Sequence, residues 1–367
     1  MLRAMRCQPL SQLAIVSIIL LTKLLGCADS NKKADQSQSE KITGNNLNPP
    51  MVATNASGTV GSIERLDPAI NELLADDAKI ELLVEGLQWA EGPVWSAGGL
   101  YFSDVPQNTL YRWTPSEGVH PFLKPSGYTG TVPRGGEPGS NGLTLDHEGR
   151  LVICQHGDRR VVRLEHDGKT LTVLADRYKG MRFSSPNDLC FDSRGNLYFT
   201  DPPYGLVGHD QDPAKEMDLN GVYLLRPSGE LIRLAVDLKF PNGIAFTPDE
   251  KGLYILVSDP NNPVVMKYDV QADGTITNGR VFFDASALVA KNLPGLPDGM
   301  KVDVKGNTWF GGPGGILIVS PEGKHLGTLL TGVRTANCGW GDDGSTLYIC
   351  SEHRLLRIKT KTKGKLP

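Results

Sequence analysis

The sequence predicts an all-β protein, a six-bladed β-propeller whose last blade is closed by an N-terminal strand. The main observation is a short phrase that occurs six times. In it an oxygen-bearing polar residue, usually followed by Gly, begins an apolar stretch that leads through an acidic turn into a second apolar stretch. The phrases begin at Glu91, Asn141, Asn187, Asn242, Asp298 and Asn337. Starts spaced by roughly 40 to 55 residues are typical of a propeller or another repeat array.

Inside each repeat, the second observation is a hairpin pattern. Apolar residues alternate with period two, a turn such as Asp146-His-Glu-Gly or Asp192-Ser-Arg-Gly follows, and a second apolar run begins. Asp and Gly between such runs are typical of antiparallel strands. Most repeats continue into further strand-like segments, for example at 109–113, 221–225 and 315–319. Radially arranged repeats of three to four strands form propeller blades.

The third observation concerns closure of the ring. The last repeat supplies about three strands, the third at 354–359, whereas the strand-like segment 79–84 precedes the first repeat and has no partner of its own. We predict that this segment completes the sixth blade, which would join the two ends of the domain and protect an open strand edge.

Composition fits one globular domain over residues 62–367. A formal charge of −3 offers no basic field for nucleic acid, and 42 glycines suit a turn-rich β protein. The cysteines of this domain are Cys154, Cys190, Cys338 and Cys350. All four fall in apolar strand segments, where buried thiols are the simplest interpretation. Cys338 and Cys350 lie on strands expected to pair, so a disulfide between them is the alternative.

Residues 1–27 have the pattern of a signal peptide. Arg3 and Arg6 precede a short apolar stretch, and the segment ends in Leu-Leu-Gly-Cys27, which resembles a bacterial lipobox although Lys23 interrupts the apolar run. Residues 28–61 are rich in Ser, Asn, Gln, Lys and Gly and predict a disordered linker. We expect an exported bacterial lipoprotein, in the periplasm or at the cell surface, that meets the membrane only through its lipid anchor. An ordinary or uncleaved signal is the alternative.

The six residues that begin the repeats should form a ring. Each starts the innermost strand of a blade, so their side chains meet where the central channel opens on one face. Two carboxylates and four amides offer oxygen ligands, which suit Ca²⁺ or Mg²⁺ better than zinc. For any single Asn-Gly or Asp-Gly pair, ordinary turn chemistry is a sufficient explanation. Six in phase favour a metal site or an active site.

Further polar residues end the second strand of the hairpins and return to the same face. They are Asp104, His156, Asp201, Asp259 and the pair Glu352-His353. Each alone is explained as a turn residue or a solvated charge, but together they are candidates to support the ring or to bind substrate. Two long loops, 129–140 and 202–216, belong to this face, and Arg134, Tyr204 and His209 on them are candidates to touch substrate.

Five segments carry a resemblance to a known family. They are Glu-Gly-Pro-Val-Trp at 91–95, Ser-Pro-Asn-Asp at 185–188, Tyr-Phe-Thr-Asp-Pro-Pro-Tyr-Gly at 198–205, Pro-Asn-Gly-Ile-Ala-Phe at 241–246 and Pro-Asp-Gly-Met-Lys-Val-Asp at 297–303. In this order, over roughly residues 80–358, the chain resembles the SMP-30/gluconolactonase/luciferin-regenerating-enzyme (LRE-like) family. In the branch typified by the animal senescence-marker protein, an Arg that helps hold the sugar lies two residues before the Asn of the third blade. Here that position is Ser185.

The resemblance implies a hydrolase of sugar lactones with one divalent metal ion in the channel. Calcium is the first expectation, ahead of Mg²⁺, Mn²⁺ or Zn²⁺. Carried over by motif, the ligands are Glu91, Asn187, Asn242 and Asp298, and Asp298 is also the general acid/base while the metal polarises the lactone carbonyl. The candidates that bind substrate or support these ligands are Asn141, His156, Asp201, Tyr204, Asn337 and His353. The partner is then a small-molecule lactone; the oligomeric state stays open.

Two alternatives remain at this point. The same site is compatible with hydrolysis of phosphotriesters or of other lactones. A non-catalytic propeller, tethered to a membrane and holding a structural calcium, is the alternative from another class. No Gly-Xaa-Ser-Xaa-Gly segment occurs, which argues against a serine esterase.

Overall fold

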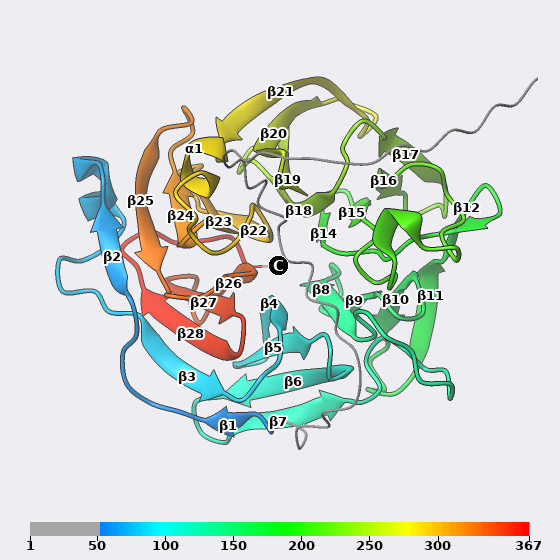
Figure 1. The fold of residues 1–367 in the computed structure, drawn as a ribbon, viewed down its shortest axis with the longest axis horizontal. Coiled ribbons are helices and arrows are strands. Elements are labelled where there is room, and N and C mark those ends of the chain that lie inside the picture. The colour runs from blue at the N-terminus through cyan, green and yellow to red at the C-terminus, as the bar shows by residue number, and fades with distance from the viewer. Residues whose placement is uncertain (1–51, 367) are drawn as a thin grey trace, which may run out of the picture. The chain divides into compact units, whose positions relative to one another are not determined.

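The computed structural model describes residues 52–366, which form a six-bladed β-propeller (Figure 1). The predicted signal peptide, the lipobox and residues 28–51 of the predicted linker lie outside the described residues. Within them, no helix is long and apolar enough to cross a membrane. The helical segments are η1 (Pro68–Glu72), η2 (His209–Gln211) and α1 (Ser286–Val289).

Four blades are regular antiparallel sheets of four strands in chain order. Blade 1 has β4 (Ala90–Ser96), β5 (Gly99–Asp104), β6 (Thr109–Thr114) and β7 (Gly118–Leu123). Blade 2 has β8 (Ser140–Leu145), β9 (Leu151–Gln155), β10 (Arg160–Leu164) and β11 (Leu171–Ala175). Blade 3 has β14 (Leu189–Phe191), β15 (Leu197–Asp201), β16 (Gly221–Leu225) and β17 (Leu231–Ala235). Blade 4 has β18 (Pro241–Phe246), β19 (Gly252–Asp259), β20 (Asn262–Val270) and β21 (Ile276–Asp284).

The last two blades each receive strands from the N-terminal part of the chain. Blade 5 has β22 (Met300–Val302), β23 (Thr308–Gly312), β24 (Gly315–Val319) and β25 (His325–Leu330), with β2 (Ser62–Arg65) at its outer edge. Blade 6 has β26 (Asn337–Gly341), β27 (Thr346–Ser351) and β28 (Arg354–Lys359), followed by β3 (Glu81–Glu85) and β1 (Thr54–Asn55). A small hairpin, β12 (Arg177–Tyr178) and β13 (Met181–Arg182), follows blade 2.

Ring closure by the segment before the first repeat is confirmed. Strand β3 pairs antiparallel with β28, with Val84 opposite Leu355 and Leu82 opposite Leu356. The linker boundary at residue 61 is corrected, because Thr54 and its neighbour in β1 pair with the outer edge of β3. This polar segment has no apolar period to reveal it. Strand β1 is bound through its backbone, because the free N–H and C=O groups of an edge strand can pair with any extended segment regardless of its sequence.

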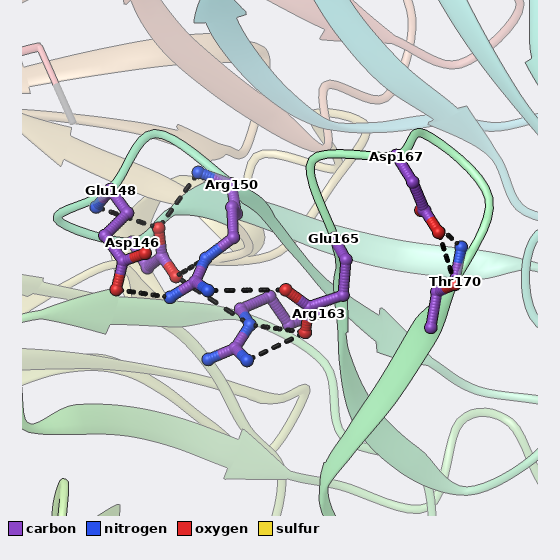
Figure 2. Close-up of polar contacts among 7 residues, drawn as sticks. All are labelled: Asp146, Glu148, Arg150, Arg163, Glu165, Asp167 and Thr170. Atoms are coloured by element: carbon purple, nitrogen blue, oxygen red, sulfur yellow. Dashed lines mark hydrogen bonds and ion pairs between the residues drawn. The ribbon is translucent and has the colours of Figure 1, made fainter.

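The acidic turns of blades 2, 3 and 5 have a local structural function. In blade 2, Asp146 Oδ1 accepts hydrogen bonds from the backbone N–H groups of Glu148 and Arg150, at 3.0 and 2.9 Å. The Arg150 side chain adds ion pairs to Asp146 and Glu165, and the same turn is seen in Figure 2. Asp192 and Asp303 cap the corresponding turns of blades 3 and 5 in the same way. These acids therefore stabilise hairpin turns at the ends of the inner strands opposite to the ring residues.

Apolar side chains of adjacent blades form the core between them. One group joins blades 5 and 6 with the N-terminal segment and includes Ile70, Trp309 and Trp340. The disulfide alternative for Cys338 and Cys350 is wrong: both thiols are free and buried. The register of β26 and β27 sets Cys350 opposite Asn337 and Cys338 opposite Ile349. The two thiols are thus one residue out of step, and they point to opposite faces of the sheet.

Candidate metal centre in the central channel

The inner strands of the six blades, β4, β8, β14, β18, β22 and β26, surround the central axis, and the residues that begin the repeats stand at or just before the starts of these strands (Figure 1). A cavity of about 330 Å³ opens there. Of the predicted ring it is lined by Glu91, Asn141, Asn187, Asn242 and Asp298. The sixth member, Asn337, does not line the cavity: its Nδ2 donates to Glu91 Oε2 at 3.1 Å and its Oδ1 accepts from the backbone of Cys338. The structure thus makes Asn337 a support for Glu91.

Glycine follows most ring residues because adjacent blades approach closely there. The Gly142 N–H donates to the Asn187 carbonyl at 2.7 Å, and a Cβ at Gly142 would lie 2.4 Å from that oxygen. The same close approach occurs at Gly243, where a Cβ would lie 2.3 Å from the Asp298 carbonyl. Neither glycine has a positive φ. Ordinary Asn-Gly turn chemistry therefore does not explain these pairs, whose glycines admit the next blade's backbone.

The side-chain amide of Asn242 is held in one orientation. Its Nδ2 donates to Ser258 Oγ at 3.0 Å, and Ser258 in turn donates to the carbonyl of Pro297. Because Ser258 uses its proton on Pro297, it accepts from the amide nitrogen, and Asn242 Oδ1 is directed away from Ser258. The backbone carbonyl of Asn242 is occupied as well, by the Thr200 hydroxyl at 2.8 Å. The amide oxygen is the acceptor that Asn242 keeps for the cavity.

Two carboxylates in the channel wall hold their protons unusually strongly in the metal-free protein. Burial, opposed in part by the Asn337 hydrogen bond, raises the pKa of Glu91 to about 8. Burial, together with the negative charge of Glu91, raises the pKa of Asp298 well above its ordinary value. Two neighbouring acids that are shielded from solvent and repel each other lower their free energy either by protonation or by sharing a cation.

Unpartnered oxygens test whether the channel fits a cation. Asn141 Oδ1 and Asp188 Oδ2 are fully buried and have no hydrogen-bond partner. Asp188 lies next to Asn187, and its negative charge adds to the raised pKa of both Glu91 and Asp298. Buried acceptors without donors are costly unless a positive group compensates them. Lys301 supplies positive charge to Asp188, whereas Asn141 Oδ1 lines the cavity without a donor. The set is oxygen-rich and contains no thiolate, so it fits a hard divalent ion such as Ca²⁺ or Mg²⁺.

Several residues at the ends of second strands serve the backbone and not the cavity. Asp201 accepts the N–H groups of Ser184 and Ser185 at 2.9 and 2.7 Å, which fixes the chain just before Asn187. Asp104 accepts from Gln88 and Trp89 in the same manner.

Two other predicted rim residues, His353 and Asp259, are also not among the side chains that line the cavity. The side chain of His353 is 41% exposed, with Glu352 beside it, and Asp259 accepts from the backbone of Asn261. His156 is different, because it is fully buried and its Nε2 lies 3.5 Å from Asn187 Nδ2.

The two long loops meet above the cavity. Arg134 joins them, because its guanidinium donates to the carbonyl of Gly157 at 2.7 Å and to that of Gly205. Tyr204 lines the cavity and stacks on Phe240 with ring centroids 5.7 Å apart. His209 does not line it and contacts the edge of Tyr204 instead.

Ser185, which stands where one branch of the family has an arginine, is also buried under these loops. Its hydroxyl donates to the Pro202 carbonyl at 2.6 Å and accepts from the Gly205 N–H at 2.8 Å. Both groups belong to the loop that carries Tyr204, so Ser185 anchors that loop.

Sequence reasoning missed several residues of the cavity wall. They are Trp89, Glu137, Ser258, Leu296 and Arg334. Glu137 belongs to the loop 129–140, which is expected to shape the substrate pocket, but nothing in its local sequence distinguishes it from the other polar residues of that loop. Arg334 lies with its guanidinium 4.7 Å above the Trp89 ring and pairs with Glu352 at 3.0 Å. The Glu137 carboxylate and the Arg334 guanidinium therefore border the same opening.

Comparison with known proteins agrees with this arrangement. The gluconolactonase of Zymomonas mobilis is 40% identical over 319 residues, 83% of this chain and 88% of that protein. A pentonolactonase of Haloferax volcanii is 26% identical over 267 residues, 71% of this chain and 80% of that protein. A solved gluconolactonase from Xanthomonas campestris superposes with a TM-score of 0.71 at 29% identity, covering 86% of this chain and 99% of that one.

The model of one family, described as the SMP-30/gluconolactonase/LRE-like region, matches residues 89–353. That segment begins just before Glu91 and contains every ring residue. With a match over most of the chain and a relative at 40% identity, this protein belongs to the SMP-30/gluconolactonase/LRE-like family.

Proposed function

We propose that this protein is a metal-dependent hydrolase of sugar lactones. The observation that carries the proposal is the convergence of buried Glu91 and half-buried Asp298 with three asparagine side chains in one cavity, in a chain similar to a gluconolactonase. Glu91, Asn187, Asn242 and Asp298 hold the ion, and Ca²⁺ is the first candidate. The pentonolactonase relative supports the same class of reaction, hydrolysis of a cyclic carboxylic ester.

The residues of the chain divide the work of the reaction. A divalent ion in such a site supplies polarisation of the scissile carbonyl and stabilisation of the negative charge that develops on its oxygen. Asp298 takes a proton from the attacking water and returns it to the alkoxide that leaves when the ring opens. Glu137 and Arg334 at the opening are placed to hydrogen-bond the hydroxyl groups of a sugar lactone, and Tyr204 covers it.

The direct test is hydrolysis of D-glucono-1,5-lactone by protein stripped of metal and then given Ca²⁺, Mg²⁺, Mn²⁺ or Zn²⁺. We expect activity that one of these ions restores. Asp298→Asn should lower kcat at least ~10²-fold, the usual scale for a positioned acid/base. The matched control is Asp259→Asn, a carboxylate on the same face that does not line the cavity, and it should keep most of the activity.

Other outcomes would redirect the proposal. Full turnover by Asp298→Asn would remove the proton-transfer role. Tight cation binding without hydrolysis of any sugar lactone would contradict the substrate class, and phosphotriesters or other lactones would then be screened. A cation that stabilises the fold of a protein with no turnover at all would favour the binding propeller.

We also propose export and lipid anchoring at Cys27, from the sequence pattern alone. Incorporation of labelled palmitate into the wild-type chain and its loss in Cys27→Ser would support an anchor. Unchanged membrane association of Cys27→Ser would contradict it.

A further inference from the structure

The side chain of His156 is buried beside Asn187 and is not among the side chains that line the cavity. His156 follows the second strand of blade 2 and is fully buried, and its Nε2 lies 3.5 Å from Asn187 Nδ2. Its Nδ1 lies 3.0 Å from Glu137 Oε2. Glu137 comes from the loop before β8 and reaches the cavity with the side chain 36% exposed. Glu137 therefore contacts His156, and His156 in turn contacts the amide of Asn187.

The chemistry of these contacts sets the proton on one imidazole nitrogen. A carboxylate only accepts hydrogen bonds, so the imidazole nitrogen beside Glu137 carries the proton. Nδ1 is buried and makes no aligned hydrogen bond, and Glu137 Oε2 at 3.0 Å is the acceptor beside it that compensates this N–H electrostatically. In the tautomer with its proton on Nδ1, the ring presents a lone pair at Nε2. A lone pair opposite Asn187 accepts from the amide nitrogen and repels the amide oxygen.

We infer that Glu137 and His156 form a positioning pair that orients the side-chain amide of Asn187 so that its Oδ1 faces the channel. Blade 4 achieves the same result by other means, since Ser258 accepts from Asn242 Nδ2. An amide turned by half a rotation would present N–H groups to a cation and could not bind it. The inference rests on the proposed cation site, but its direct consequence is cation affinity and not the choice of substrate.

Calorimetric titration of the metal-stripped protein with Ca²⁺ tests the pair. His156→Leu should raise Kd at least about tenfold, the lower end of the effect of residues that orient a metal ligand. His156→Gln should retain much of the affinity, because its carbonyl oxygen can accept from Asn187 Nδ2. Glu137→Ala should weaken binding in the same direction as His156→Leu. Phe183→Leu, a change in the nearby core with no polar contact to the ring, should leave Kd unchanged.

A double-mutant comparison separates orientation from packing. In Asn187→Asp the two carboxylate oxygens are equivalent, so no orienting partner is needed. His156→Leu should then change Kd less than about threefold, against tenfold or more in the Asn187 background. Equal losses in both backgrounds would overturn the inference and assign His156 to packing. Unchanged Kd in His156→Leu or in Glu137→Ala would overturn it as well.

Folding and the proposed function are tested independently. If His156→Leu does not fold, Glu137→Ala on the surface loop supplies the same readout. A wild-type protein that binds none of Ca²⁺, Mg²⁺, Mn²⁺ and Zn²⁺ would overturn both the positioning pair and the metal site. Lactone hydrolysis is measured in parallel, and its result tests the proposed reaction independently. Normal Kd changes with no lactone hydrolysis would support the pair and contradict the proposed reaction.

Discussion

At the scale of single residues, the channel concentrates acids that ordinary proteins keep apart. Glu91 and Asp188 are nearly inaccessible to solvent and Asp298 is half-buried, and the first two raise the pKa of the third. Such a cluster is a cost to the fold without a cation. It becomes favourable when an ion compensates the charges, because metal binding and deprotonation are then coupled.

The pH dependence of stability should reveal this cluster. An unfolded chain ionises Glu91 near the ordinary pKa of 4.5, whereas the folded metal-free protein keeps the proton to about 8. Between these values only the unfolded state has lost its proton, so stability falls as pH rises, by up to about 1.4 kcal/mol per pH unit for one group. Asp298 acts in the same direction.

Urea unfolding of EDTA-treated protein at pH 5 and pH 8 measures this slope. Saturating Ca²⁺ should flatten it, because the bound ion keeps the carboxylates ionised. Glu91→Gln, as a control, should flatten it without the ion. Identical slopes for metal-free and Ca²⁺-saturated wild-type protein would show that these carboxylates do not govern the pH response.

At the scale of elements, the ring depends on one strand that arrives from the N-terminal side. Strand β3 completes blade 6, and its Val84 is fully buried in the core shared by blades 6 and 1. Glu85 of the same strand is exposed. The strand therefore combines backbone pairing to β28 with apolar packing against the neighbouring blade.

Val84→Asp should open the ring. An unpaired charge in this position has no partner to compensate its burial, so we expect a loss of more than about 3 kcal/mol in the free energy of unfolding. Glu85→Ala, the matched exposed change, should stay within about 0.5 kcal/mol. Denaturant titration followed by circular dichroism compares them. A Val84→Asp protein as stable as the parent would disprove closure by β3.

Arg134, which joins the two long loops, should affect substrate binding without affecting the stability of the fold. Arg134→Ala removes donors to Gly157 and Gly205 and releases the loops that carry Glu137 and Tyr204. We expect KM for the lactone to rise several-fold, while Tm changes by only a few degrees because the loops lie outside the blade cores. Arg177→Ala, on the exposed hairpin β12–β13, should change neither value. A large fall in Tm with unchanged KM would assign Arg134 to stability instead.

At the scale of the whole molecule, the proposed ligands come from four different blades. Glu91 belongs to blade 1, Asn187 to blade 3, Asn242 to blade 4 and Asp298 to blade 5. The segment after β28 also joins blades, beside the turns that lie opposite the ring. The Lys363 carbonyl accepts from the Val304 N–H of blade 5, and the Lys365 ammonium pairs with Glu250 of blade 4. An ion held by these four ligands would connect blades at one end of the channel, as this segment does at the other.

Removal of the ion should therefore loosen the entire propeller. A ligand present at a hundredfold excess over Kd stabilises the folded state by about 2.7 kcal/mol. We expect EDTA to lower Tm by several degrees and Ca²⁺ to restore it, as measured by differential scanning fluorimetry. Asn242→Leu should abolish the shift, whereas Asp259→Asn should preserve it. A Tm that is insensitive to EDTA would contradict a bridging ion.

Much of the architecture was predictable because a propeller is a local pattern repeated. The alternation of apolar residues defines each hairpin, the Asp turns end it, and the spacing of six phrases counts the blades. The unpartnered segment 79–84 predicted closure, since a ring cannot leave one blade short of a strand. Equivalent residues of equivalent strands meet at the axis, which is why five of the six predicted ring residues line one cavity.

The remaining features depend on contacts between segments distant in the chain, which no local pattern encodes. Glu137 reaches the cavity through an irregular loop, and Asn337 leaves it because Glu91 accepts its amide. The orientation of an amide depends on a partner in the same or an adjacent blade, as Ser258 shows for Asn242. Repetition along the chain thus establishes the blades and the ring, whereas packing between blades decides which oxygens face the channel and which groups hold them there.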